Sequence, residues 1–478
     1  MSLKNEIISK VLLTTEQYKG SFAAFRTAVL QNEYTSTNPN FSRLLIWKLC
    51  FLTETLNIPS WELKLLASRA VYQLLRSNPE MNVPWHKLDK DNEFYQPNAS
   101  KLIPNTVAHP LTRIHDVQDD PLSAKTAPDD LQKKNNPVQT DSELLDAIIL
   151  DVQRLFPGED YFHNGLDAAF AAKRQLITIL YIWCKCNPTV GYKQGIHEIL
   201  GLIYLNMIKE SVSLTNTTDC TADDMMILSL YNLQYLEHDL FALFNRFVVS
   251  SGIVAAFYET EQLLMRSIES FNGLLMKVDQ LVHYNLITKL RLDTPLWIIR
   301  FLRLLLLREL SNDLEVASLL WDKLVAAELE KPIGQTCLSD MIICMIVVML
   351  VHLKTELMLC DFSEALSLLL HYPITTKMTV YPDFMNLLFR DAHNLHALRD
   401  KDLKLYEYGI KLNKMYNSKI KVNFGASNGS TPSSPGVLSP KASLEMPSKA
   451  DTRAAKLKFE KNRLEMRLKK RAQEMINQ

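Results

Sequence analysis

Glycine and cysteine are both scarce in this 478-residue sequence, at 13 and 7 residues. Few glycines disfavour an all-β fold with many tight turns and agree better with long helices. Seven cysteines in so long a chain do not make a disulfide framework, so we expect reduced thiols and a cytoplasmic location. The chain also has no net charge, with 53 basic and 53 acidic residues, and therefore no general attraction for nucleic acid.

Long apolar runs are missing as well. The first ten residues carry mixed charge and lack the apolar stretch of a signal peptide. The most apolar segment, residues 341–351, is too short to span a bilayer, which takes about 20 residues. We interpret it as a buried helix and expect any membrane association to be peripheral.

Several enzyme signatures are absent from the sequence. There is no phosphate-binding P-loop, no G-x-S-x-G nucleophile elbow and no kinase motif. His197 and Glu198 begin an H-E-x-x-H pattern, but Gly201 occupies the second histidine position, so we predict no metal site. If the protein is an enzyme, its side chains must act on a substrate group that another molecule binds.

Apolar residues at helical spacing predict an all-α, two-lobed fold without the strand–helix alternation of a parallel sheet. The predicted helices cover residues 42–51, 61–75, 144–156, 166–186, 195–208, 222–236, 240–250, 267–284, 296–308, 314–327, 339–353 and 361–371.

Composition divides the chain into parts: an N-terminal segment, a main domain with a polar, partly disordered insertion, an extension, a disordered Ser/Pro-rich linker and a basic charged helix. These are residues 1–39, 40–395 with the insertion at 89–140, 396–423, 424–450 and 451–478. Ser-Pro and Thr-Pro pairs in the linker motivate a hypothesis of phosphorylation. The basic helix is interpreted as a solvated helix, with binding to anionic membrane or to a partner helix as the alternative.

Two short segments carry the functional interpretation. The first is I-I-L-D-V-Q-R-L-F-P, in which Asp151 and Arg154 share a helix face and Pro157 ends the helix, with Arg154 in its last turn. The second is P-T-V-G-Y-K-Q-G, a loop in which Gln194 precedes Gly195. Taken alone, each has a plain structural reading: a surface ion pair and a polar turn between helices.

Together these segments resemble the I-x-x-D-x-x-R and Y-x-Q-G motifs of TBC domains, in the right order and about 40 residues apart. Ile148, Asp151 and Arg154 match the first motif, and Tyr192, Gln194 and Gly195 match the second. Three further segments are similar to the family's opening R-x-x-x-W-K-L helix, its acidic-Phe segment and its late arginine-rich helix with L-W-D: residues 43–49, 237–241 and 300–322. The residues within and around both motifs look most similar to those of the member-five-like subgroup and its yeast relatives.

The resemblance implies a GTPase-activating protein for a GTP-bound Rab GTPase, with Arg154 as an arginine finger and Gln194 as a glutamine finger. Asp151, Tyr192 and Gly195 are then supporting residues. Arg300, Arg303, Trp321 and Asp322 either line the groove for the partner or are structural. The chain needs no cofactor or metal of its own, because GTP and Mg²⁺ arrive on the Rab.

The same resemblance implies a role in vesicle traffic at Golgi or endosomal membranes, reached through the Rab or the basic tail. Two alternatives stay open. One is a catalytically silent scaffold or adaptor with the TBC fold. The other is a helical adaptor unrelated to GTPases.

Overall fold

The structure, a computed structural model, describes residues 3–96, 140–215, 220–310, 313–328 and 338–417. Within these ranges the chain forms helices and turns, with one isolated β-bridge between Val212 and Asn232 and no strand. The predicted all-helical fold is therefore confirmed. The predicted linker, the charged helix and residues 97–139 of the insertion lie outside the described residues.

The N-terminal half of the fold contains ten α-helices among the described residues. They are α1 (Leu3–Gln17), α2 (Phe22–Leu30), α3 (Arg43–Lys48), α4 (Trp61–Ser77), α5 (Asp141–Gln153), α6 (Asp160–His163), α7 (Asp167–Cys186), α8 (Ile196–Ile208), α9 (Ala222–Ser229) and α10 (Leu236–Asn245). Two of them continue as π-helical turns, α3 into Leu49–Thr53 and α10 into Arg246–Ser250.

The C-terminal half adds the remaining described α-helices. They are α11 (Ile253–Phe257), α12 (Glu261–Val278), α13 (Gln280–His283), α14 (Pro295–Arg303), α15 (Leu314–Glu328), α16 (Leu338–His352), α17 (Lys354–Leu359), α18 (Phe362–Leu370), α19 (Ile374–Val380), α20 (Phe384–Leu398) and α21 (Asp402–Tyr416).

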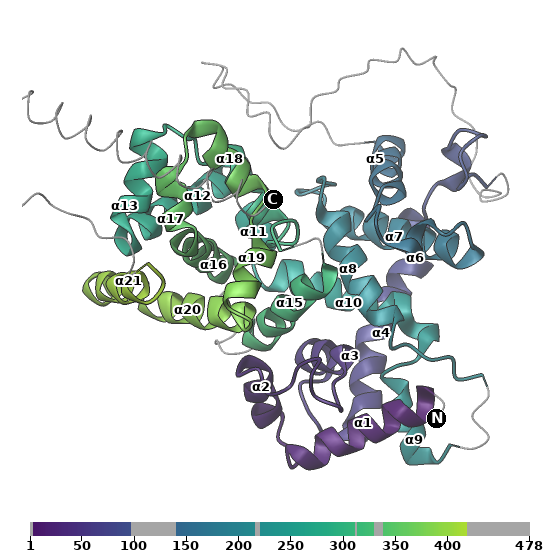
Figure 1. Ribbon diagram of the computed structural model, residues 1–478. Coiled ribbons are helices and arrows are strands. Elements are labelled where there is room, and N and C mark those ends of the chain that lie inside the picture. The colour runs from purple at the N-terminus through teal and green to yellow at the C-terminus, as the bar shows by residue number, and fades with distance from the viewer. Residues whose placement is uncertain (1–2, 97–139, 216–219, 311–312, 329–337, 418–478) are drawn as a thin grey trace, which may run out of the picture.

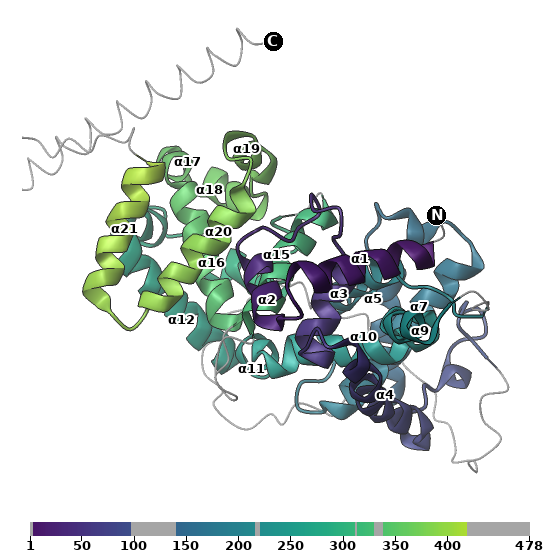
Figure 2. The ribbon, with the colours of Figure 1, turned by 90° about the horizontal axis from the view of Figure 1, so that it is seen from below.

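These helices gather into two lobes, visible in both Figure 1 and Figure 2. Helices α1 to α10 form one lobe, and α12 and α16 to α21 form the other, with α15 between them. Helix α15 packs against α2 and α3 on one side and against α20 on the other. It therefore joins the two lobes through a shared core.

Helix α16 lies at the centre of the C-terminal lobe, packed between α12 and α20. All of its side chains except that of Asp340 are buried. This confirms the interpretation of residues 341–351 as a buried helix. Within the described residues, no helix is both long enough and apolar enough to cross a membrane.

Helix α4 was predicted from apolar residues at helical spacing over residues 61–75, but three of them, Leu63, Leu66 and Leu74, are exposed. Leu63 and Leu74 are 76% and 73% exposed. The buried face instead contains Trp61, Arg69 and Tyr72. Arg69 is buried because its Nε and Nη2 donate to the carboxylate of Asp239 on α10, so a charged residue occupies a core position.

The predicted insertion begins as part of the folded domain. Phe94 is buried and its ring stacks on Phe170 of α7, with ring centroids 5.0 Å apart. The side chain of Gln96 accepts a hydrogen bond of 2.7 Å from Arg174 on the same helix. The described start of the insertion therefore packs against the lobe that holds both motif segments.

Candidate functional site

Arg154 directly follows the last residue of α5, and its backbone caps that helix. The sequence predicted a helix that runs to Phe156 with Arg154 in its last turn; α5 instead ends at Gln153, three residues earlier. The chain then turns through Leu155 and Phe156, which are both buried, and Phe156 has a left-handed φ of 42°. The helix stops because these two side chains turn inward to pack against α8.

The close approach of this turn to α8 depends on a glycine within that helix. A β-carbon on Gly201 would lie 2.7 Å from Cδ2 of Leu155 and 3.2 Å from the ring of Phe156. A side chain at this position would push the turn outward. Gly201, which stands where the H-E-x-x-H pattern needs its second histidine, therefore allows the arginine segment to pack closely against α8.

Asp151 holds the Arg154 side chain from one turn earlier on α5. Nε of Arg154 donates to Oδ1 of Asp151 at 3.1 Å, and Nη2 donates to the same oxygen. The carboxylate is buried, whereas the arginine side chain is 54% exposed. The guanidinium is thus held at the surface in a defined direction.

The second motif forms the loop between α7 and α8. Gly191 and Gly195 both adopt left-handed backbone conformations, with φ of 61° and 99°. Gly195 is the N-cap of α8, and its carbonyl accepts the amide of Glu198. Gln194 stands just before this cap and is exposed.

A hydrogen bond joins the two motif segments. The hydroxyl of Tyr192 donates to Oδ2 of Asp151 at 2.7 Å, while Arg154 uses the other oxygen of that carboxylate. Burial, followed by the negative charge of Asp151, raises the pKa of Tyr192 well above 10, so the hydroxyl keeps the proton that it donates. One carboxylate therefore fixes the arginine segment relative to the glutamine loop.

A turn that follows α14 supports the glutamine loop from the other side. Leu304 lies against Gly195. Arg308 donates to Oε1 of Glu198 at 2.9 Å and forms an ion pair with its Oε2 at 2.8 Å. Leu305 and Leu306 both have left-handed φ, of 51° and 66°. The sequence predicted one helix over residues 296–308, which is wrong, because α14 ends at Arg303 and this strained turn replaces its last part.

Arg300 and Arg303 make contacts inside the C-terminal lobe. Nε of Arg300 donates to buried Glu309 at 2.7 Å, and its Nη2 donates to the carbonyl of Leu370. Arg303 donates to the carbonyl of Phe257 at 3.2 Å. These contacts support the structural alternative for both residues.

Trp321 and Asp322 are buried in α15. Nε1 of Trp321 donates to the carbonyl of Leu305 at 3.1 Å. Asp322 accepts Nε of Arg43 at 2.9 Å and Nε1 of Trp47 at 2.9 Å. The opening helix of the motif set is thereby tied to α15, and the L-W-D residues support the fold from within the core.

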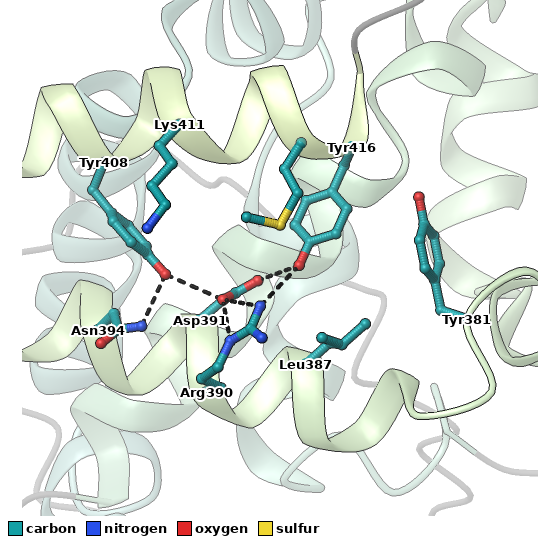
Figure 3. Close-up of a pocket in the computed structure, with 9 residues that line it drawn as sticks. Tyr381, Leu387, Arg390, Asp391, Asn394, Tyr408, Lys411 and Tyr416 are labelled. Carbon is teal, nitrogen blue, oxygen red and sulfur yellow. Dashed lines mark hydrogen bonds and ion pairs between the residues drawn. The ribbon is translucent and has the colours of Figure 1, made fainter.

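A separate cleft of about 490 Å³ lies between α20 and α21 (Figure 3). Asp391 accepts Nε of Arg390 at 3.0 Å and the hydroxyls of Tyr408 and Tyr416 at 3.1 Å and 2.5 Å. No residue of either motif segment lines it. Within the ranges that the structure describes, no three His, Cys, Asp or Glu side chains gather as a metal site.

The structure adds residues that the motifs did not single out. Leu304, Arg308 and Gly201 support the two segments from α8 and from the turn after α14. His197 lies 3.0 Å from the hydroxyl of Tyr192. Each is one residue without a motif of its own, and only the three-dimensional contacts relate it to Arg154 or Gln194.

Comparison with known proteins relates this chain to a protein family. The model of the Rab-GTPase-TBC domain matches residues 97–358, which is more than half of the chain and includes both motif segments. A solved structure, the Ypt/Rab-GAP domain of Gyp1p, aligns with a TM-score of 0.53 at 16% identity, over 82% of this chain and 99% of that one. At this identity the alignment supports the fold.

Relatives of similar sequence carry names from the same family. Mouse TBC1 domain family member 5 is 21% identical over 340 residues, which are 62% of this chain and 40% of that protein. Homolog B of this protein from Dictyostelium discoideum is 34% identical over 100 residues, 21% of this chain and 9% of that protein. The GTPase-activating protein gyp1 of Schizosaccharomyces pombe is 24% identical over 237 residues, 50% of this chain and 42% of that protein.

The chain thus spans less than half the length of each of these relatives. The predicted resemblance to TBC domains, including the member-five and yeast proteins, is confirmed by these matches. Because the family model covers more than half of the sequence and the fold agrees, the chain belongs to the Rab-GTPase-TBC domain family.

Proposed function

We propose that this chain is a GTPase-activating protein that supplies Arg154 and Gln194 in trans to the active site of a Rab GTPase. The observation that carries the proposal is the shared carboxylate of Asp151, which bonds Arg154 directly and the glutamine loop through Tyr192. Both finger side chains are exposed on adjoining segments. That is the arrangement needed to reach into another protein.

Arg154 supplies charge where the reaction develops it. In phosphoryl transfer, negative charge spreads over the transferred group, and a planar guanidinium donates to several of its oxygens at once. An arginine supplied in trans accelerates hydrolysis roughly 10³- to 10⁵-fold, which corresponds to about 4–7 kcal/mol of barrier. Lysine would bring the charge without the planar fork.

Gln194 is assigned to the attacking water. Its amide both donates and accepts hydrogen bonds, so it can orient the water for attack in line with the leaving group. Neither finger transfers a proton in this scheme, and catalysis is positional and electrostatic. GTP and Mg²⁺ are carried by the Rab, and the chain is assigned no cofactor of its own.

The cellular setting follows from the same proposal. A GTP-bound Rab is the partner, and it brings the chain to Golgi or endosomal membranes, where vesicle traffic is controlled. Under the alternative interpretation of the basic segment 451–478, its positive charge assists this recruitment by binding anionic membrane. Deletion of everything after Val422 is expected to weaken membrane localisation. Unchanged localisation would show that the tail has no part in recruitment.

The activity is tested by single-turnover GTP hydrolysis on a panel of Rab proteins. Wild type is expected to accelerate one or a few of them, and Arg154→Ala and Gln194→Ala to lose most of that acceleration. Arg390→Ala is a matched control, because Arg390 is 49% exposed and also bonds a buried aspartate. Gln262→Ala controls for loss of an exposed glutamine.

Either of two results would contradict the proposal. If folded wild type accelerates no Rab on the full panel, the chain is a scaffold with the TBC fold that holds finger residues without using them. If Arg154→Ala is as active as Arg390→Ala, the arginine finger is assigned to the wrong residue.

A further inference from the structure

We propose that His197 is a positioning residue for both fingers. Its Nδ1 donates to Tyr192, and the Tyr192 hydroxyl donates to Asp151, the carboxylate that also accepts Arg154. The inference rests on the proposed function and extends it to a residue that touches neither the Rab nor GTP. His197 lies in the first turn of α8 and is buried. Its Nδ1 is 3.0 Å from the Tyr192 hydroxyl and 3.4 Å from Oδ2 of Asp151.

Counting protons fixes the direction of this hydrogen-bonded chain. An ionised carboxylate only accepts hydrogen bonds, and a tyrosine hydroxyl has one proton to donate. The 2.7 Å contact between Tyr192 and Asp151 uses that proton, since two bare oxygens at this distance would repel each other. Nδ1 of His197 must then carry a proton and donate it to the tyrosine oxygen.

The ring performs this role in its neutral form. Burial lowers the pKa of His197 below 6.5, and the nearby Arg154 and Arg308 lower it further, while Asp151 and Glu198 oppose them. A neutral ring with the proton on Nδ1 donates to Tyr192 without adding a cation. A charged ring 3.4 Å from Oδ2 would compete with Arg154 for the carboxylate.

Both fingers depend on this one imidazole, because Gln194 lies in sequence between Tyr192 and His197. The bond between Tyr192 and His197 closes a short loop with Gln194 between its two ends. The same hydroxyl continues to Asp151 and so to Arg154. Loss of the Nδ1 donor therefore loosens the glutamine loop and the arginine carboxylate together.

The test compares three histidine variants in single-turnover hydrolysis with the Rab that wild type accelerates. His197→Leu removes the donor but fills the space, whereas the amide of His197→Asn places an N–H near the former Nδ1. His238→Leu is the control, because His238 is a partly buried histidine on α10 that bonds Gln73 and no residue of either motif.

We expect His197→Leu to lower the rate at saturating activator by about tenfold, the effect of one lost hydrogen bond in a positioned site. The activator concentration that gives half the maximal rate should stay the same. His197→Asn should recover most of the rate, and His238→Leu should match wild type. Equal loss in the leucine and asparagine variants would show a packing role and overturn the proposal.

A second arm uses Tyr192→Phe, which interrupts the chain at its middle. Adding His197→Leu to Tyr192→Phe should lower the rate little further, because the hydroxyl through which His197 positions both segments is already gone. Additive losses would separate the two residues and contradict a common chain.

The tautomer can be read without any GTPase, by long-range ¹H–¹⁵N correlation on wild-type protein with labelled histidine and His197→Asn as the assignment reference. A proton on Nδ1 is expected, and a proton on Nε2 alone would overturn the chain. This separates the two failures. If wild type accelerates no Rab but Nδ1 is protonated, the proposed function fails while the hydrogen-bonded chain stands.

Discussion

The side chain of Leu304 fills the space that a side chain on Gly195 would need: a β-carbon built there would lie 2.7 Å from its Cδ2. Gly195 also has a φ of 99°, which only glycine adopts without strain. The backbone beside Gln194 therefore presses directly on the turn after α14. Contact at this point ties the glutamine loop to residues more than a hundred positions later in the chain.

Gly201→Ala is predicted to disturb the arginine segment. The new methyl group would meet Leu155 at 2.7 Å, so we expect a loss of about 1–3 kcal/mol in the free energy of unfolding and a reduced rate of Rab-dependent hydrolysis. Gly273→Ala in α12 is the matched control, since nothing lies within 4 Å of its β-carbon position. The control should gain about 0.5–1 kcal/mol, as alanine does in a helix. Urea unfolding of both variants, with single-turnover assays, checks this.

Asp239→Ala is predicted to be among the most destabilising substitutions in the N-terminal lobe. The buried carboxylate accepts Lys48 at 2.7 Å and Arg69 at 2.7 Å and 2.8 Å, and its removal leaves two buried cations without a counter-charge. We expect a loss of about 3–5 kcal/mol in the free energy of unfolding. Asp402→Ala breaks an exposed pair with Lys277 and should change it by less than about 1 kcal/mol. Equal effects would refute the burial argument.

Arg300→Met is predicted to affect stability and not catalysis. The variant leaves Glu309 buried without its ion pair, and burial already raises the pKa of that carboxyl. Chemical denaturation should show a clear loss, of about 3 kcal/mol. The folded variant should accelerate GTP hydrolysis by the Rab as much as wild type does. A variant that folds stably but is inactive would show that Arg300 contributes to the groove that binds the partner.

His352 is predicted to make stability depend on pH. Burial, and then the charge of Lys377, lower its pKa from 6.5 to about 3. Between these values the unfolded chain binds a proton that the folded chain does not, so the free energy of unfolding falls as the pH drops below about 6.5. From pH 6.5 to pH 5 the loss approaches about 2 kcal/mol at most.

Comparison with His352→Phe isolates this contribution. Wild type should lose stability relative to the variant as the pH falls from 7 to 5, because the phenylalanine does not titrate. A difference that stays constant from pH 7 to pH 5 would show that His352 titrates normally in the folded protein.

The sequence predicted most helices because apolar residues recur at their spacing, but it did not predict which face is buried. In α4, Leu63, Leu66 and Leu74 are exposed, and Arg69 is buried. The reason is Asp239, which lies 170 residues away in sequence and supplies the counter-charge. Local spacing contains no information about a partner at that distance.

The candidate site shows the same division. Arg154 and Gln194 were identified through the resemblance of two motifs, each of which is uninformative alone. Their relation to one another is made by Tyr192 and Asp151, which only the fold brings within 2.7 Å. The end of α14 was missed because Leu305 and Leu306, which are good helix formers, take left-handed conformations imposed by tertiary packing.

The pairing of Arg154 with Asp151 has a kinetic consequence. An arginine side chain has about 2 kcal/mol of rotamer entropy, and much of it is lost when the guanidinium is fixed. Here the carboxylate imposes that loss when the protein folds, before any GTPase arrives. If Arg154 acts as proposed, it then needs little conformational search during an encounter with the GTPase, so a short-lived complex is expected to be long enough for catalysis.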